Sequence, residues 1–181
     1  MDVTIKERSV SFASEYDIST PGGNYYARKK VLSFTDHIEV HAEGGAVIAQ
    51  IEGEFSPLRG RHEFIFHDGR RYQFGCEKLW TQGYKCEGNG ETYWLYQHRG
   101  LKFSLFKDDR QIAAIEKNRI VFGSGNQYQI QMDTDANALL VVCMVITINT
   151  LDDDNDHDTV TIDLGNIGPE ERPYDPEWQP R

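Results

Sequence analysis

The sequence has few cysteines, few prolines and a deficit of positive charge. Three cysteines among 181 residues are too few, and odd in number, for the disulfide framework of a small secreted domain. A bond between Cys76 and Cys86 across a hairpin stays open as an alternative. Nineteen basic residues against 29 acidic ones give a net charge of −10, which opposes non-specific binding to nucleic acid. We therefore expect a cytoplasmic protein whose partner is not nucleic acid.

Long hydrophobic runs and targeting segments are also lacking. The longest apolar stretch, residues 138–148, is shorter than the roughly 20 residues that a membrane-spanning helix needs. Residues 1–11 alternate charged and apolar side chains and contain no signal-peptide core. The sequence therefore predicts no integral membrane segment.

Signatures of catalysis are lacking as well. The Gly-x-Ser-x-Gly pattern of nucleophilic enzymes is absent, and Ser124 follows Gly123 outside a strand–turn–helix context. The six histidines show no metal-ligand spacing. We expect no catalytic residues and no cofactor.

Turn signals are abundant, and they recur about every ten residues. Glycine and asparagine tolerate the positive φ of tight hairpin turns, and the intervening runs are rich in aromatic and β-branched residues. This spacing predicts a mainly β antiparallel meander that closes into a barrel or a sandwich. The breaks are Pro21-Gly22-Gly23, Gly44-Gly45, Asp68-Gly69, Gly88-Asn89-Gly90, Asp108-Asp109 and Gly123-Ser124-Gly125-Asn126.

The apolar stretch 138–148 breaks this pattern. A buried helix, a long buried strand and a membrane segment are the three interpretations. Its β-branched residues disfavour a helix by a few tenths of a kcal/mol each, whereas burial of a large side chain contributes about 1.5–3 kcal/mol. We therefore favour a buried helix at about 136–150. Thr134 and Asp135 are the candidate N-caps, and Asn149–Asp152 is the candidate exit.

The composition changes after Leu151. Residues 152–158 form an acidic run, and residues 165–181 contain four prolines. The sequence predicts one β-barrel domain over 1–151 and an acidic, proline-containing C-terminal tail over 152–181.

The order of a long meander followed by one wholly apolar helix is distinctive. It is carried by Tyr25–Phe34, Ile38–Val40, Gly45–Phe55, Leu58–Phe64 and the apolar stretch. Over about Tyr25 to Leu151, this pattern resembles the tubby C-terminal-like superfamily, within it the LURP-one-related and phospholipid-scramblase branch. The resemblance implies a closed antiparallel barrel of about twelve strands around a buried, apolar C-terminal helix. A barrel of that size has a lumen too wide for its own side chains to fill.

The resemblance also implies a function. It suggests a non-catalytic binding or scaffolding protein, whose partner is a protein or a lipid head group. The alternative is a membrane- or phosphoinositide-associated, scramblase-like protein that responds to calcium. The acidic run follows the helix, whereas the proposed calcium segment of scramblases precedes it. Their cysteine- and proline-rich N-terminal region is also missing, and both departures weigh against lipid scrambling.

Two sets of residues are candidate sites. Tubby proteins bind phosphoinositide head groups through basic residues, and a basic cluster offers an analogue: Arg28, Lys29, Lys30, Arg59 and Arg61, with Arg70 and Arg71 nearby. The alternative is charge that protects strand edges. The acidic run offers calcium ligands at alternate positions: Asp152, Asp154, Asp156 and Asp158. His157 replaces the glycine of a calcium loop and Asp163 its last glutamate, so a solvated charge run is the alternative.

Overall fold

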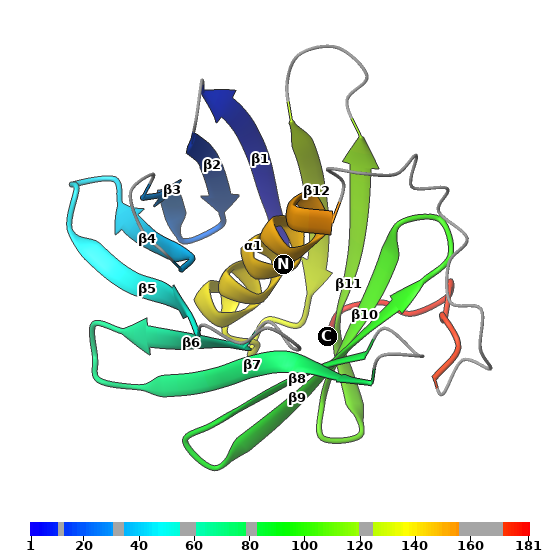
Figure 1. The fold of residues 1–181 in the computed structure, drawn as a ribbon. Coiled ribbons are helices and arrows are strands. Elements are labelled where there is room, and N and C mark those ends of the chain that lie inside the picture. The colour runs from blue at the N-terminus through cyan, green and yellow to red at the C-terminus, as the bar shows by residue number, and fades with distance from the viewer. Residues whose placement is uncertain (11–12, 31–34, 55–60, 79–82, 120–124, 156–171) are drawn as a thin grey trace.

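The computed structural model describes residues 1–181 except 11–12, 31–34, 55–60, 79–82, 120–124 and 156–171. Within the described residues, twelve strands are followed by one helix (Figure 1). The strands are β1 (Asp2–Val10), β2 (Ala13–Thr20), β3 (Gly23–Lys29), β4 (His37–Ala42), β5 (Val47–Gly53), β6 (Arg61–Phe66), β7 (Arg71–Lys78), β8 (Gly83–Gly88), β9 (Glu91–His98), β10 (Lys102–Lys107), β11 (Arg110–Arg119) and β12 (Asn126–Met132). The helix α1 spans Ala138–Asn155.

The strands form a closed antiparallel barrel. Each strand pairs with the next along the chain, and β1 pairs with β12 to close the circle. At this seam Ile5 lies opposite Tyr128, and Val3 lies opposite Ile130. The prediction of a mainly β, closed antiparallel barrel of about twelve strands is confirmed.

The helix α1 runs through the lumen of the barrel (Figure 1). It is apolar around its whole circumference, and at most 2% of each of these side chains is exposed: Leu140, Val141, Val142, Cys143, Met144, Val145, Ile146 and Ile148. Burial of so many large side chains outweighs the low helix propensity of the β-branched ones. The buried helix is thus confirmed, and the long-strand alternative is wrong.

The ends of α1 differ from the expected ones. The N-cap is Asn137, whose Oδ1 accepts a hydrogen bond from the Leu140 N–H at 3.2 Å, and not Thr134 or Asp135. Asn149 does not mark an exit, because it lies inside the helix and is fully buried. The helix extends to Asn155, so a domain boundary after Leu151 falls within it.

Alternation along the strands separates the lumen from the outer face. In β12, Tyr128, Ile130 and Met132 are buried, while Gln129 and Gln131 between them are exposed. The inward side chains and α1 make one continuous hydrophobic core. The helix α1 therefore supplies the centre of this core.

Part of the C-terminal tail lies on the outer face. The Arg172 guanidinium pairs with Asp109 and lies 4.5 Å from the ring centroid of Phe106. The Tyr174 ring lies 5.4 Å from that of His98. Tyr96, which points away from the lumen, is consequently buried, so β9 is covered on both sides at this residue.

The cysteines are free. Cys76 lies opposite Tyr84 and Cys86 lies opposite Phe74, so the two cysteines are not cross-strand partners. The hairpin disulfide between them is therefore not formed.

Candidate functional site

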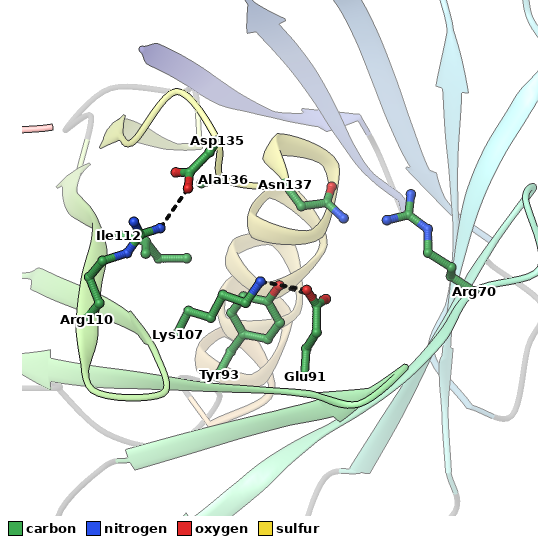
Figure 2. Close-up of a pocket in the computed structure, with 9 residues that line it drawn as sticks. All are labelled: Arg70, Glu91, Tyr93, Lys107, Arg110, Ile112, Asp135, Ala136 and Asn137. Atoms are coloured by element: carbon green, nitrogen blue, oxygen red, sulfur yellow. Dashed lines mark hydrogen bonds and ion pairs between the residues drawn. The ribbon is translucent and has the colours of Figure 1, made fainter. Parts of the chain in front are cut away.

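A cavity opens at the end of the barrel where α1 begins. We call it the proximal cavity, and it has a volume of about 230 Å³. Figure 2 shows the side chains around it, which come from the ends of several strands and from the turn before α1. The lining residues are Arg70, Glu91, Tyr93, Lys107, Arg110, Ile112, Asp135, Ala136 and Asn137.

Hairpin turns place the charged side chains at this end. Asn89 and Gly90, both with positive φ, make the turn that leads into Glu91. Asp108, with φ of 54°, lies in the turn between Lys107 and Arg110. The same local chemistry that folds the meander therefore positions the lining.

Glu91 is the most strongly held of these residues. Its Oε1 accepts a hydrogen bond from Lys107 Nζ at 2.6 Å, and its Oε2 accepts one each from the Tyr72 and Tyr93 hydroxyls at 3.0 Å. The Lys107 ammonium, helped by the two hydroxyls, lowers the pKa of Glu91. Burial and the neighbouring carboxylate raise the pKa of both tyrosines. Glu91 is therefore a fixed carboxylate that holds Lys107 at the rim of the cavity.

Arg110 lies on the other side of the cavity between two aspartates (Figure 2 shows the Asp135 contact). Its Nη2 lies 2.9 Å from Asp135 Oδ2 and 3.8 Å from Asp133 Oδ2. Asp135 is largely exposed, whereas Asp133 is buried, and its Oδ1 accepts a hydrogen bond from the Arg181 N–H at 2.8 Å. Arg110 therefore has one anchored acidic partner and one loosely held partner.

Arg70 is the third cation of the lining. Its Nε donates to Asp68 Oδ2 at 2.8 Å, and its guanidinium lies 5.4 Å from the Phe66 ring centroid. Three cationic and two acidic side chains line the cavity, and two further carboxylates, Asp68 and Asp133, lie beside Arg70 and Arg110. Each cation of the proximal cavity is therefore paired with at least one carboxylate.

The basic cluster predicted from the sequence is not brought together. Arg28, Lys29 and Lys30 lie on or just after β3, and Arg61 begins β6, with two strands between them in the sheet. Arg59 lies outside the described residues. The cluster is therefore spread over the surface around β4 and β5.

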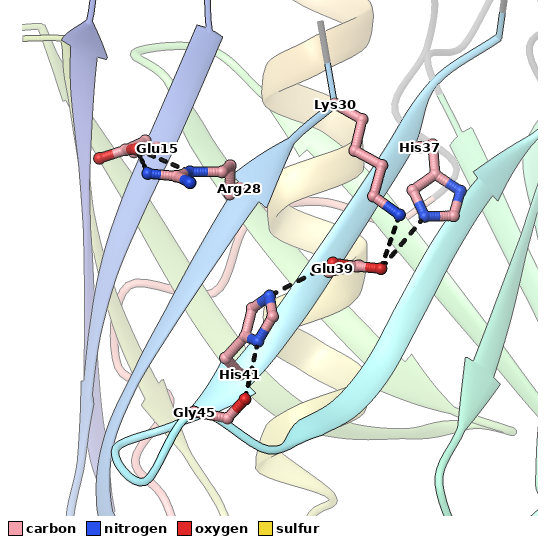
Figure 3. Close-up of polar contacts among 7 residues, drawn as sticks. All are labelled: Glu15, Arg28, Lys30, His37, Glu39, His41 and Gly45. Atoms are coloured by element: carbon pink, nitrogen blue, oxygen red, sulfur yellow. Dashed lines mark hydrogen bonds and ion pairs between the residues drawn. The ribbon is translucent and has the colours of Figure 1, made fainter. Parts of the chain in front are cut away.

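Carboxylates neutralise the β3 side of that cluster. Figure 3 shows Arg28 paired with Glu15, at 2.6 Å, and Lys30 paired with Glu39, at 2.8 Å, on the outer face. Arg71, which was noted beside the cluster, pairs with Glu63. These are cross-strand pairs of the type that stabilises sheets.

Lys29 faces the opposite direction, into the lumen at its far end. Its Nζ lies 2.7 Å from Asp36 Oδ1, and Asp36 Oδ2 lies 3.2 Å from Nε2 of the buried His62. The hydrogen bond from His62, together with Lys29, lowers the pKa of Asp36 to about 2. Gly53 packs against this pair, because a Cβ there would lie 3.1 Å from the Asp36 backbone nitrogen.

The four predicted calcium ligands are divided between α1 and residues that the structure does not describe. Asp152 and Asp154 belong to the last turns of α1, and Asp156 and Asp158 lie outside the described residues. Elsewhere in the described part of the chain, no three His, Cys, Asp or Glu side chains are grouped as metal ligands. His37 and His41 flank Glu39 on the outer face, where Figure 3 shows both contacting its carboxylate.

A second hollow, of about 440 Å³, lies on the outer face between β11, β12, β1 and Tyr174. Its charged side chains are Asp2 and Glu116, which add to the negative charge of the molecule.

The sequence analysis did not identify the proximal cavity, although the sequence contains a signal for it. That signal is a set of charged residues that each adjoin a predicted hairpin turn: Arg70, Glu91, Lys107 and Arg110.

The fold defines a class: a closed, twelve-stranded antiparallel barrel filled by its C-terminal helix. None of the helices in the described residues has the length and apolar character to cross a membrane. A scan against protein-family models found no match, and neither the curated proteins nor the solved structures gave one.

Proposed function

We propose that the protein is a non-catalytic binding protein of the tubby C-terminal-like type and that its ligand binds in the proximal cavity. The observation that carries the proposal is this cavity itself, which is lined by three cations, each of them held in place by a carboxylate. The succession of twelve strands and one lumen-filling helix supports the family part of the proposal.

The chemistry of the lining favours binding over catalysis. A general acid or base works best with a pKa near the operating pH. The pKa values of Glu91 and Asp135 are lowered, by hydrogen bonds from Lys107 and Arg110, and the pKa of Tyr93 is raised, first by burial. The pKa of each of these groups is thereby moved away from pH 7, so the lining offers fixed charges and hydrogen bonds.

An obstruction of the cavity tests the proposal. Ala136 lines it, and Ala136→Trp places a large ring where the ligand would lie. Ala46→Trp is the matched control, because Ala46 is exposed in the turn between β4 and β5. Ala136→Leu serves as a smaller obstruction, and circular dichroism checks that each variant is folded.

The measurement is the thermal unfolding midpoint with a panel of small anions, sugars, amino acids and amines. A ligand at a hundred times its Kd stabilises a protein by about 2.7 kcal/mol, which raises Tm by several degrees. We expect at least one compound to raise the Tm of the wild type and of Ala46→Trp, but not of the Ala136 variants. Equal stabilisation of all proteins, or of none, contradicts the proposal.

A further inference from the structure

We infer that a saccharide, free or at the end of a larger glycan, binds on the outer face of the barrel. The site is the hollow of about 440 Å³ between β1, β11, β12 and Tyr174, which we call the outer hollow. It is separate from the proximal cavity, so it adds a second site to the proposed function and does not depend on it.

Strand register brings the side chains of the outer hollow together. Two rows of three side chains cross β1, β12 and β11: Asp2, Gln131 and Ala114 in one row, and Thr4, Gln129 and Glu116 in the next. Neighbouring strands lie about 4.8 Å apart, and residues two apart along a strand face the same side at about 6.7 Å. A ligand of about 10 Å in length therefore reaches both rows.

Most of these side chains have hydrogen-bonding groups to spare. Four of the six make no hydrogen bond or ion pair to another group of the described residues: Asp2, Thr4, Gln129 and Gln131. Elsewhere on the outer face, polar neighbours on adjacent strands are paired with one another, as Arg28 is with Glu15. The outer hollow thus presents donors and acceptors side by side that a ligand can bind in place of water.

The mixture of donors and acceptors favours hydroxyl groups. The amides of Gln129 and Gln131 each offer two N–H donors and a carbonyl oxygen, whereas the Asp2 carboxylate only accepts. A hydroxyl group is a donor and an acceptor at once, so a ligand with several hydroxyls satisfies both kinds of group. Val3 and Ile130 also line the outer hollow, but their side chains are buried in the core, so an apolar ligand gains little there.

The charges of the outer hollow do not select an ion. The Glu116 Oε1 lies 3.1 Å from Lys102 Nζ. Asp2 follows the Met1 ammonium, which donates to the Met132 carbonyl oxygen. Because the two carboxylates of the lining are accompanied by two cations, a neutral ligand leaves the charge balance unchanged.

The C-terminal tail completes the outer hollow with one aromatic side chain. The Tyr174 ring centroid lies 4.8 Å from Lys102 Nζ and 5.4 Å from that of the His98 ring, and Arg172 is paired with Asp109. Tyrosine has an apolar body and a polar hydroxyl. A sugar likewise has C–H groups beside its hydroxyls, so the docked tail supplies a matching wall.

The size and position of the outer hollow suit one or two sugar rings. Sites for small molecules have volumes of about 300–1,000 Å³, and the outer hollow, at about 440 Å³, falls in this range. Since it lies on the outer face, the remainder of a longer glycan can extend beyond it.

Saturation-transfer difference NMR of the full chain with free sugars tests the inference, followed by isothermal titration. The probes are glucose, galactose, mannose, N-acetylglucosamine, maltose and cellobiose, and we expect at least one to bind. Gln129→Ala and Tyr174→Ala should weaken binding at least fivefold, and Ala114→Leu should abolish it by filling the hollow. Gln73→Ala is the matched control, because Gln73 is an exposed glutamine on β7, and it should bind like the wild type.

Salt and charged compounds test the neutral character of the ligand. Salt screens interactions between charges, so the Kd of the saccharide should be nearly the same at low salt and at about 1 M NaCl. Binding of no saccharide, or equal binding by Gln129→Ala and the wild type, overturns the inference. Binding of spermidine that Gln129→Ala weakens, with no saccharide bound, also overturns it.

Sedimentation with insoluble cellulose, starch and chitin distinguishes the two sources of the saccharide. Sedimentation with one polymer that Gln129→Ala reduces supports the end of a glycan. Binding of free sugars without sedimentation supports a small saccharide.

The outer hollow and the proximal cavity respond to different variants. A compound in the proximal cavity loses binding in Ala136→Trp and keeps it in Ala114→Leu, whereas a saccharide in the outer hollow does the reverse. If Ala136→Trp abolishes the binding of every saccharide, the inference is overturned and the proposed function stands.

Discussion

The Asn149 side chain of α1 has its Oδ1 2.8 Å from the hydroxyl of Tyr128 on β12, inside the barrel. The same oxygen accepts a hydrogen bond from Asn126 Nδ2 at 2.8 Å, and Asn149 Nδ2 donates to the Tyr16 hydroxyl at 3.2 Å. The preceding turns of α1 are apolar on every side, and hydrophobic burial has no direction. The buried amide therefore sets the rotation and depth of the helix, as a buried asparagine sets register in a coiled coil.

Replacement of Asn149 by leucine should destabilise the protein. Asn149→Leu removes the hydrogen-bond partner of three side chains, and we expect a loss of about 3 kcal/mol in the free energy of unfolding. Urea denaturation measures the change. Thr150→Val is the control, because Thr150 Oγ1 bonds only the Ile146 carbonyl of its own helix among the contacts described, at 3.1 Å. A loss for Thr150→Val as large as that for Asn149→Leu would show that the network has no special role.

Gly88 should not tolerate a side chain. A Cβ at this position would lie 2.1 Å from the Arg71 carbonyl oxygen and 2.8 Å from the Tyr72 Cα, so the β7 backbone would have to move. We expect Gly88→Ala to lower the free energy of unfolding by about 3 kcal/mol. Gly44→Ala should be close to neutral, because a Cβ there meets no atom within 4 Å. Thermal unfolding of the two variants, measured side by side, makes the comparison.

The ion pair at the far end of the lumen predicts a pH dependence. Since the hydrogen bond from His62 lowers the pKa of Asp36 from 3.8 to about 2, the folded state favours the ionised carboxylate. The resulting stabilisation, about 2 kcal/mol, is present above pH 4 and is lost as the pH falls toward 2. Asp36→Asn should therefore be less stable than the wild type at pH 7, with the difference shrinking between pH 4 and pH 2.

Asp17→Asn is the control for this pH series. Asp17 pairs with Arg8 on the outer face, where both side chains are about half exposed, so its replacement should change stability little. A difference between Asp36→Asn and the wild type that stays constant down to pH 2 would argue against the assigned electrostatics.

The three cysteines should differ in reactivity. Cys86 and Cys143 are buried, and burial raises the pKa of both thiols, that of Cys143 to about 12. Cys76 is partly exposed, so iodoacetamide should modify it first in the native protein. Mass spectrometry of peptides after brief labelling measures this order, and all three should react in 6 M guanidinium. Early labelling of Cys143 would mean that α1 leaves the lumen readily.

The strands could be predicted from the sequence because their turns are local. Gly88-Asn89-Gly90 and Asp108-Asp109 specify hairpins through the φ values that those residues accept, without reference to distant parts of the chain. The buried helix could also be predicted, since a wholly apolar segment of that length needs a core. Its polar anchor could not, because asparagine near a helix end is also an exit signal, and its partner Tyr16 lies 133 residues earlier.

The turn signals place four charged residues of the proximal cavity at hairpin ends, but they do not predict that these residues converge. Arg110 points to the lumen only because a bulge after Leu105 shifts the register between β10 and β11. The neighbours Asp133 and Asp135 come from the turn between β12 and α1, whose position depends on the closed barrel. The basic cluster was attractive in the sequence because Arg28, Lys29 and Lys30 are consecutive there, but alternation sends Lys29 inward and Arg28 outward.

The seam between β1 and β12 has a consequence for how the chain folds. The strand β1 pairs with β12, and the turn after β12 leads directly into α1, which fills the lumen. Closure of the barrel and filling of its lumen therefore both depend on segments that follow the other eleven strands. Such non-local pairing predicts slow folding, with nascent strands that need protection until the circle is complete.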